Sequence, residues 1–114
     1  MSSIRPKGRA EFKNRASAFA ALGDETRLSL IEKLSDGPPQ SISRLAQGSA
    51  VTRQAITKHL QVLEDARIVR SERVGRESLF VLRPQPLKKL QSYLERLSDH
   101  WERTLARLKS FVEN

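Results

Sequence analysis

Apolar and polar positions form their clearest pattern over residues 52–66, TRQAITKHLQVLEDA. Apolar residues recur there at intervals of three and four, which builds one stripe along a helix: Ala55, Ile56, Leu60 and Leu63, widened by Val62 and Ala66. Polar residues gather off that stripe in the first three turns: Arg53, Gln54, Thr57, Lys58 and Gln61. Thr52 can cap this helix, and the positive end of the helix dipole then suits a phosphate. The segment fits a DNA groove, although an ordinary surface helix with a solvated polar face has the same pattern.

Three further helices are predicted before this segment. The first covers residues 9–22, and its apolar stripe is formed by Phe12, Ala16, Phe19 and Ala20. The second is capped by Asp24 and stops at Gly37-Pro38-Pro39, and its apolar face holds Leu28, Ile31 and Leu34. The third covers residues 41–47, with Ser41 as its candidate N-cap. A short helix, a Gly-containing connection and a second helix with a polar outer face together form the helix-turn-helix pattern.

Two strands are predicted next, over residues 68–74 and 77–82, around Gly75-Arg76. The second strand is apolar enough to be half-buried, whereas the first alternates only loosely. A two-stranded hairpin is marginal alone and must pack on the helices. A helix-turn-helix followed by a hairpin is a winged helix, with Arg73 and Arg76 in its basic wing. Arg76 at the tip can enter a narrow minor groove, and a solvated turn residue is the alternative.

The last helix is predicted over residues 86–112, after Pro84 and Pro86 end the strand. Its apolar residues form a near-heptad seam over ~40 Å: Leu87, Leu90, Leu94, Leu97, Trp101, Leu105, Leu108 and Val112. One domain can hardly cover such a seam, so we expect a homodimer across a two-fold axis. The expected interface comprises Phe12, Phe19, Leu90, Leu94, Leu97, Trp101, Leu105 and Leu108. Burial of the seam against the chain's own first two helices is the alternative.

Length and composition narrow the class of protein. The 114 residues predict one domain over 9–112, preceded by a flexible basic arm over 1–8 in which Pro6 and Gly8 oppose regular structure. Lys and Arg outnumber Asp and Glu by 21 to 13, and the net charge of +8 favours a polyanionic partner. The absence of cysteine excludes disulfides, thiolate metal sites and cysteine nucleophiles. Since no apolar run reaches the ~20 residues of a membrane span, we expect a cytoplasmic protein.

Three segments between about Phe19 and Leu82 are specific in combination: FAALGDETRLSLIEKL, LAQGSAVTRQAITKHLQVLEDARIV and RVGRESLFVL. With them the chain resembles the ArsR/SmtB-type winged helix-turn-helix repressors. The resemblance implies a mainly α fold with a small β-hairpin, in the order α-α-α-α-β-β-α, and a homodimer joined by the first and last helices. It also implies double-stranded DNA as the partner and repression that an inducer relieves. The operator, the regulated genes and the inducer are unknown from the sequence.

The resemblance places the DNA contacts on the helix of residues 52–66. Arg53 and Gln54 suit base edges, Arg for guanine and Gln for adenine, and Thr57 can contact bases or phosphates. Phosphate contacts are assigned to Ser41, Arg44, Thr52, Lys58 and His59. His59 lies beside the apolar Leu60, and it can instead be an interior histidine that satisfies a local hydrogen bond.

The sequence departs from the family at its metal-sensing positions. Where metal sensors carry a Cys-x-Cys pair, this chain has Ser41-Ile42-Ser43, and neutral hydroxyls are poor ligands for thiophilic metals. The other family site needs a later histidine on the last helix, but Asp99-His100 is followed by none. A zinc site would have to recruit His100 with Glu102 or Glu113 across the dimer. We therefore expect a regulator with no metal and no cofactor at the known positions.

Two other classes of function compete with this reading. A winged-helix module that binds protein without specific DNA readout would use its basic residues for solubility alone. An enzyme would need a Ser-His-Asp ordering, a buried carboxylate pair, a metal set or a Gly-rich phosphate loop, and the sequence has none of these. We therefore expect a non-enzymatic, dimeric repressor of an inverted-repeat operator, and an activating role has the same sequence signature.

Overall fold

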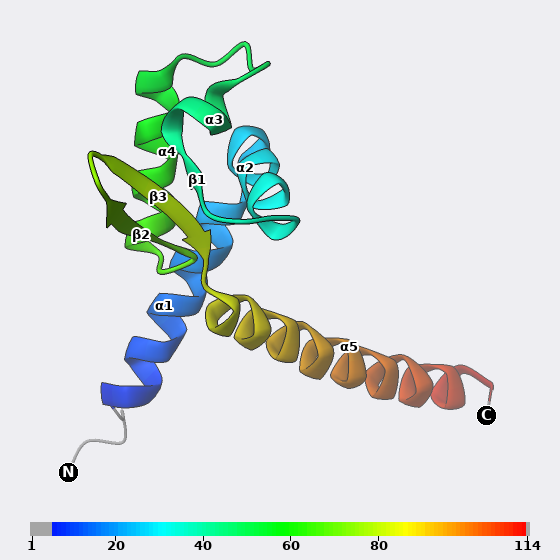
Figure 1. Cartoon of the computed structure of the whole chain (residues 1–114). Helices are drawn as coiled ribbons and strands as arrows, with labels where there is room; N and C mark the ends of the chain where they lie inside the picture. The colour runs from blue at the N-terminus through cyan, green and yellow to red at the C-terminus, as the bar shows by residue number, and fades with distance from the viewer. Residues whose placement is uncertain (1–5, 114) are drawn as a thin grey trace.

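Eight helices and strands follow one another in the computed structural model, which describes residues 6–113 (Figure 1). They are α1 (Pro6–Leu22), α2 (Glu25–Ser35), β1 (Gln40–Ser41), α3 (Ile42–Ala46), α4 (Arg53–Asp65), β2 (Val69–Val74), β3 (Glu77–Leu82) and α5 (Pro84–Glu113). The helix-turn-helix corresponds to α3 and α4, and the wing corresponds to the hairpin of β2 and β3. The mainly α winged-helix fold predicted from the sequence is therefore confirmed.

The start of α1 differs from the prediction. We expected a helix from Arg9 and a mobile arm before it, but α1 begins at Pro6, so residues 6–8 are helical. Proline is tolerated in the first turn of a helix because its missing N–H would have had no helical partner there. Residues 1–5 of the predicted arm lie outside the described residues.

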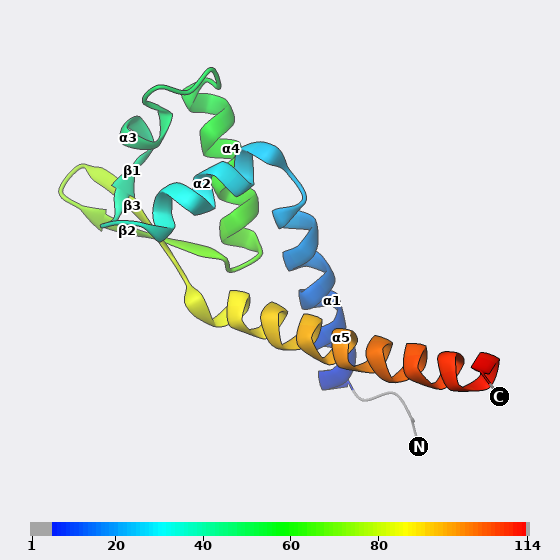
Figure 2. The same ribbon diagram turned by 90° about the vertical axis from the view of Figure 1, so that its right-hand side faces the viewer.

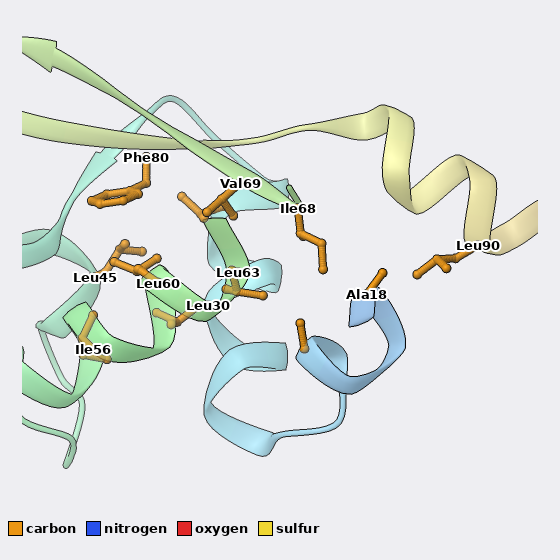
Figure 3. Packing of buried hydrophobic residues seen from close by; sticks show 12 residues of the cluster. Ala18, Leu30, Leu45, Ile56, Leu60, Leu63, Ile68, Val69, Phe80 and Leu90 are labelled. Carbon is orange, nitrogen blue, oxygen red and sulfur yellow. The ribbon is translucent and has the colours of Figure 1, made fainter. Parts of the chain in front are cut away.

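The core forms where α4 meets α1, α2, α3 and the sheet (Figure 3). From α4 it takes Ile56, Leu60 and Leu63, as the helical periodicity predicted. Val62 was expected to widen this stripe, but it is 40% exposed. The whole buried cluster comprises Ala18, Ala21, Leu30, Leu34, Leu45, Ile56, Leu60, Leu63, Ile68, Val69, Phe80 and Leu90.

The buried faces of α1 and α2 agree only in part with the apolar periodicity, because Leu34 is buried and Phe19 and Ile31 pack against the core as expected. In α2, Leu30 is 1% exposed, whereas Leu28, which we placed on the buried face, is 49% exposed. In α1, the side chains of Ala18 and Ala21 are buried, whereas Ala16 and Ala20 are exposed. Both helices contact α4 as well as each other, and the crossing of these helices decides which side chains have room to be buried.

The sheet contains a strand that the sequence did not indicate. Among the described residues the sheet has three strands in the order β1-β3-β2, all antiparallel. The two residues of β1 pair with Phe80 and Leu79 of β3, and Ser41 had been placed in a helix. The hairpin itself agrees with the prediction, with Val74 opposite Glu77 and Gly75-Arg76 between them. Gly75 has a φ of 62°, which glycine at the first position of a type II′ turn adopts at low cost.

All three predicted N-caps are confirmed. Asp24 Oδ2 accepts from the backbone N–H of Arg27 at 3.0 Å, and Ser41 Oγ accepts from that of Arg44 at 3.2 Å. Thr52 Oγ1 accepts from the backbone N–H of Ala55 at 3.1 Å, which fixes the start of α4. Each cap satisfies an amide that the helix itself leaves without a partner.

The last helix projects from the rest of the domain. It has 30 residues, begins at Pro84 rather than at residue 86, and its C-terminal end lies away from the sheet and the other helices (Figures 1 and 2). The radius of gyration is 19.0 Å, whereas a compact chain of this length has about 13 Å. The C-terminal half of α5 is therefore held by few contacts within its own chain.

The end of α4 carries a strained residue. Arg67 has a φ of 63°, and the N–H of Ile68 donates to the carbonyl of Leu63 at 2.9 Å. This is the left-handed closure of a helix that glycine usually supplies. A side chain in this region costs about 1–2 kcal/mol because its Cβ approaches the following carbonyl oxygen.

Replacing Arg67 with Gly is expected to raise the free energy of unfolding by about 1 kcal/mol, measured by urea denaturation. Arg103, which is exposed in the middle of α5, provides the control. Arg103→Gly should lower stability by about 1 kcal/mol, because glycine is unfavourable inside a helix. A loss at Arg67 equal to the loss at Arg103 would contradict the interpretation of Arg67 as strained.

Candidate nucleic-acid interface

The N-terminal half of α4 presents a polar surface to solvent. Arg53, Gln54 and Lys58 are exposed, and their side chains have no hydrogen-bond or ion-pair partner among the described residues. The opposite face of the helix is anchored by Ile56, Leu60 and Leu63, which are at most 1% exposed. A rigid helix thus offers long donors whose hydrogen-bonding groups are free for a ligand. The predicted base-reading residues Arg53 and Gln54 lie together on this surface.

The hydroxyl residues of the predicted site are partly engaged by the backbone. Thr57 is exposed, and its Oγ1 donates to the carbonyl of Arg53 at 2.8 Å, so its oxygen can still accept from a base. Ser41 and Thr52 accept backbone N–H groups as N-caps, and each hydroxyl keeps its own hydrogen to donate. Exposed Arg44 lies in α3, next to the cap formed by Ser41. These geometries suit the phosphate contacts predicted for Ser41 and Thr52.

His59 is placed apart from the exposed residues of α4. Its side chain is 25% exposed, and its Nδ1 lies 3.1 Å from a guanidinium nitrogen of Arg27 and 3.7 Å from Asp24 Oδ2. Arginine can only donate, so Nδ1 acts as the acceptor and the neutral ring carries its hydrogen on Nε2. The distance to Asp24 is outside the hydrogen-bond range, and the Arg27 contact therefore decides the tautomer. The structure favours the interior alternative for His59 over its assignment to phosphate.

Arg27 connects three helices. Its Nε donates to the carbonyl of Ala21 at 2.6 Å, and a second nitrogen donates to that of Ala20 at 3.3 Å, both at the C-terminal end of α1. The contact with His59 continues this network to α4. Arg27 therefore connects α4, which carries the polar surface, to α1 and α2. The sequence contains no signal for this role, because the partners are 6, 7 and 32 residues away.

Asp24 adds a charge to the same network. The backbone N–H of Arg27 holds the pKa of the Asp24 carboxyl below its usual 3.8. Desolvation by burial raises this pKa, and the guanidinium charge of Arg27 lowers it further. The ionised carboxylate is therefore the form that fits the folded state.

The helix before the recognition helix is also held by side chains. Lys33 Nζ donates to the carbonyl of Leu45 at the end of α3 at 3.1 Å. Gln40 Nε2 donates to the carbonyl of Lys33 at 2.8 Å, which closes the connection between α2 and β1. These bonds position α3, and with it Ser41 and Arg44, beside the start of α4.

The wing carries exposed cations on the same side of the domain as the start of α4. Arg73 and Arg76 are exposed, and Arg76 lies in the turn between β2 and β3. Arg70 is ion-paired with Glu72 and is therefore less available to a polyanion. The turn of the hairpin and the N-terminus of α4 both lie on the side of the domain away from α5 (Figures 1 and 2). One side of the molecule thus combines the helix donors with the arginines of the wing.

Most of the residues predicted for a dimer interface are exposed apolar side chains. Trp101 is 63% exposed, and the same seam of α5 includes exposed Leu94, Leu97, Leu105 and Leu108. Phe12 is exposed on α1, whereas Phe19 is partly buried against the core and lies 6.0 Å from Tyr93 between ring centroids. Leu90 departs from the prediction, because at 5% exposure it already belongs to the chain's own core. Phe111, which we did not predict, is also exposed near the end of α5.

Beside this seam lies an apolar hollow of about 440 Å³. Phe19, Leu22, Leu87 and Leu94 line it, from α1 and α5. The hollow and the seam form one apolar face that side chains of the described residues leave uncovered, so the alternative of burial against the first two helices holds only for Leu87 and Leu90.

Residues 6–113 contain neither a metal-binding cluster nor a membrane-spanning helix. No group of three His, Asp or Glu side chains converges there closely enough to hold a metal ion. Within the same span, every helix is too short or too polar to cross a bilayer.

Comparisons with known proteins agree with this geometry. Residues 22–72 match the family described as a helix-turn-helix domain. The HTH-type transcriptional regulator YuzN of Bacillus subtilis (strain 168) is 39% identical in an alignment of length 83 that covers 68% of this chain and 90% of YuzN. The ArsR-like transcriptional regulator from Rhodococcus sp. RHA1 is 41% identical, with a TM-score of 0.82 over 91% of this chain and 94% of its own.

A more distant structure shares the fold. The homodimeric winged helix-turn-helix DNA-binding domain of Mb0332 from Mycobacterium bovis has a TM-score of 0.69 at 17% identity. The match covers 90% of this chain and 95% of that domain. The relatives that share more than a third of their residues with this chain are thus transcriptional regulators.

The network around Asp24 predicts a pH dependence of stability. The folded state lowers the pKa of Asp24, so the ionised carboxylate contributes to the free energy of unfolding. This contribution is complete above the usual pKa of 3.8 and is lost as the pH falls through the lowered pKa. Asp24→Asn keeps a capping oxygen and removes the charge. The variant should therefore be less stable than the wild type at pH 6, and the difference should shrink at pH 3 in urea denaturation. An unchanged difference between the two pH values would show that the Asp24 charge does not act as described.

Proposed function

Since this chain belongs to the ArsR family of winged helix-turn-helix transcriptional regulators, we propose that it is a dimeric repressor of an inverted-repeat DNA operator. The observation that carries the proposal is the exposed, unpartnered set of Arg53, Gln54 and Lys58 at the N-terminal end of α4. It acts by binding alone, without catalysis, and in the cytoplasm, where it meets its DNA.

On DNA, α4 lies in the major groove with its N-terminal residues at the base edges. Arg53 donates two hydrogen bonds to a guanine, and Gln54 pairs with the donor and acceptor of an adenine. Thr57 accepts from a base or contacts a thymine methyl group, since its own hydrogen is already donated to the backbone. The exposed side of α4 is firmly backed by the core, and such rigidity keeps these side chains in register with the bases.

The phosphates are contacted around the start of α4 and at the wing. Ser41 and Thr52 donate their free hydroxyl hydrogens, and Lys58 and Arg44 supply charge. The N-terminus of α4 adds its dipole. Arg73 and Arg76 of the wing lie next to the duplex, with Arg76 at the minor groove. His59 is left out of this set because its side chain is only 25% exposed and is directed at Arg27 of its own chain.

The dimer is formed by the seam of α5 and by α1, through the face that includes the apolar hollow. A lone chain leaves Trp101 and four leucines of the seam exposed, and burying such side chains in a partner contributes about 1.5–3 kcal/mol each. A two-fold axis then presents two copies of α4 at a spacing of about one helical turn of DNA.

We propose that DNA binding needs no metal ion. The position of the family's Cys-x-Cys pair is held by Ser41 and Ser43, and the Ser41 oxygen is already used as the N-cap of α3. A hydroxyl in this role is a poor ligand for the thiophilic metals of those sensors.

The proposal is tested by selecting bound duplexes from a random DNA pool with metal-free protein. The expected result is a palindromic consensus with half-sites about 10 base pairs apart. Recovery of no preferred sequence, with binding that disappears at moderate salt, would leave only non-specific attraction and favour a protein-binding module.

On the selected operator, the variants Arg53→Ala and Lys58→Ala should behave differently. Arg53→Ala should cost about 1–3 kcal/mol and relax the preference at one position of each half-site. Lys58→Ala should weaken all sequences alike and reduce the salt slope by about one. Lys109→Ala, which removes an exposed charge near the end of α5, is the matched control and should change neither property. An identical, sequence-independent loss of affinity in the first two variants would refute the assignment of Arg53 to the bases and Lys58 to the phosphates.

The dimer is tested by Trp101→Ala in sedimentation equilibrium. An interface anchor contributes about 2 kcal/mol or more to association. Because the substitution is present in both protomers, two anchors are lost, and the dimer dissociation constant should rise about a thousandfold. Leu28→Ala removes an apolar side chain of α2 that is 49% exposed, outside the seam, and should leave the constant unchanged. A monomeric wild type, or equal effects of both changes, would contradict the proposed interface.

A further inference from the structure

A second hollow, of about 540 Å³, lies between α1 and the first turns of α5. Four cations line it: Arg15 from α1, and Lys88, Lys89 and Arg96 from α5. Ala18, Pro86 and Leu90 supply apolar surface, and Glu11 is the acidic residue of the lining. The balance of charge in this groove, which we call the basic groove, is therefore strongly positive.

The basic groove is not part of the DNA-binding surface. Its lining includes Ala66, the C-cap residue that follows α4. The two ends of this 13-residue helix are about 20 Å apart, so the groove lies far from the start of α4. The turn of the wing and the start of α4 point away from α5 in both views (Figures 1 and 2). The cations of the groove therefore need an explanation other than contact with the operator.

The groove opens on a different side of α5 from the apolar dimer face, although buried Leu90 borders both hollows. Arg96 follows Leu94 by two residues, which is about 200° around a helix of 3.6 residues per turn. Lys89 and Arg96 are seven residues apart and lie on one side of α5, whereas Leu87 and Leu94 line the apolar hollow. The two hollows thus flank the contact of α1 with α5 from different sides.

Two of the four cations are held in place by an aromatic ring. The guanidinium of Arg15 lies 4.1 Å from the ring centroid of Tyr93, and that of Arg96 lies 5.9 Å from it. Such contacts restrict the arginine side chains while their N–H groups stay free to donate. The lysines are exposed and add charge at the mouth. The groove is therefore partly organised before any ligand arrives.

We propose that the basic groove binds a small organic anion, with its acidic group among Arg15, Lys88, Lys89 and Arg96 and its apolar body on Ala18, Pro86 and Leu90. The volume falls within the range of roughly 300–1,000 Å³ that is usual for small-molecule sites. The start of α5 at this groove adds the positive end of a helix dipole. A neutral ligand of the same shape gains none of these charge interactions.

The position of the groove gives the ligand a way to change DNA binding, and this part of the inference depends on the proposed function. The groove joins α1 and α5, which form the dimer, to Ala66 at the end of the recognition helix. An anion that draws the cations of α1 and α5 together changes the angle between these helices, and with it the spacing of the two copies of α4. Operator affinity then depends on the ligand.

The site itself is tested by calorimetric titration of the full chain with 2-naphthoate, 2-naphthyl phosphate and the neutral 2-naphthamide. The two anions are expected to bind about tenfold or more tightly than the amide. Tighter binding of naphthyl phosphate than of naphthoate identifies a phosphate site, and tighter binding of naphthoate identifies a carboxylate site. Equal binding of the amide, or no binding of either anion, overturns the proposal.

Two double variants are compared. The test variant combines Lys88→Gln with Lys89→Gln, and the control combines Arg103→Gln with Arg107→Gln. Both pairs remove two exposed charges from α5, but only the first pair lines the groove. The first pair should weaken anion binding roughly tenfold, and the second should leave it within about twofold. An equal loss in both pairs would mean that net charge alone attracts the anion, and the site would be refuted.

The coupling is tested by measuring operator affinity of the wild type with and without saturating anion. A change of about fivefold or more, absent in the Lys88→Gln, Lys89→Gln variant, is expected for coupled sites. If the anion binds in calorimetry but operator affinity is unchanged, the coupling is refuted and the anion site remains supported. A chain that selects no operator refutes the proposed function and the coupling together, whereas the titration still decides the site.

Discussion

The burial of one face of α4 is the constraint on which the rest of the structure depends. Ile56, Leu60 and Leu63 are almost fully removed from water among side chains of α1, α2, α3 and the sheet. A helix held in this way has no freedom to rotate, because rotation would expose these residues and bury charged ones. Its other face is therefore fixed toward solvent, and that face carries the long donors. The polar surface that we propose reads DNA is a consequence of core packing.

Polar contacts then set where this helix stands relative to its neighbours. Arg27 ties the end of α1 to the start of α2 and to His59 of α4, and Lys33 with Gln40 ties α2 to α3. Hydrogen bonds to charged groups contribute more than neutral ones and depend strongly on direction. They give the helix-turn-helix a defined geometry in a domain whose core holds only twelve buried apolar residues among those described. The same contacts explain why a histidine inside the recognition helix is directed at its own protein.

The division of the remaining surface follows from the crossing of α1 with α5. One side of the crossing is apolar and continues into the seam of Trp101 and the leucines, while the other side is the basic groove. An extended helix with an uncovered apolar seam is unfavourable in water alone, which is why the projecting shape of the chain points to a second copy. The proposed association, DNA binding and ligand binding thus use three different faces of one small domain.

Much of this protein could be predicted from its sequence because the signals are local. The spacing of Ile56, Leu60 and Leu63, the caps at Asp24, Ser41 and Thr52, and the Gly75 turn each depend on residues within one or two turns of each other. Only the tertiary structure decided the rest. The buried faces of α1 and α2, the pairing of β1 with β3, the Arg27–His59 contact, the interior place of Leu90 and the basic groove join residues distant in sequence. Periodicity shows that a face is apolar, but helix crossing angles and the competition for space in the core choose which side chains fill it.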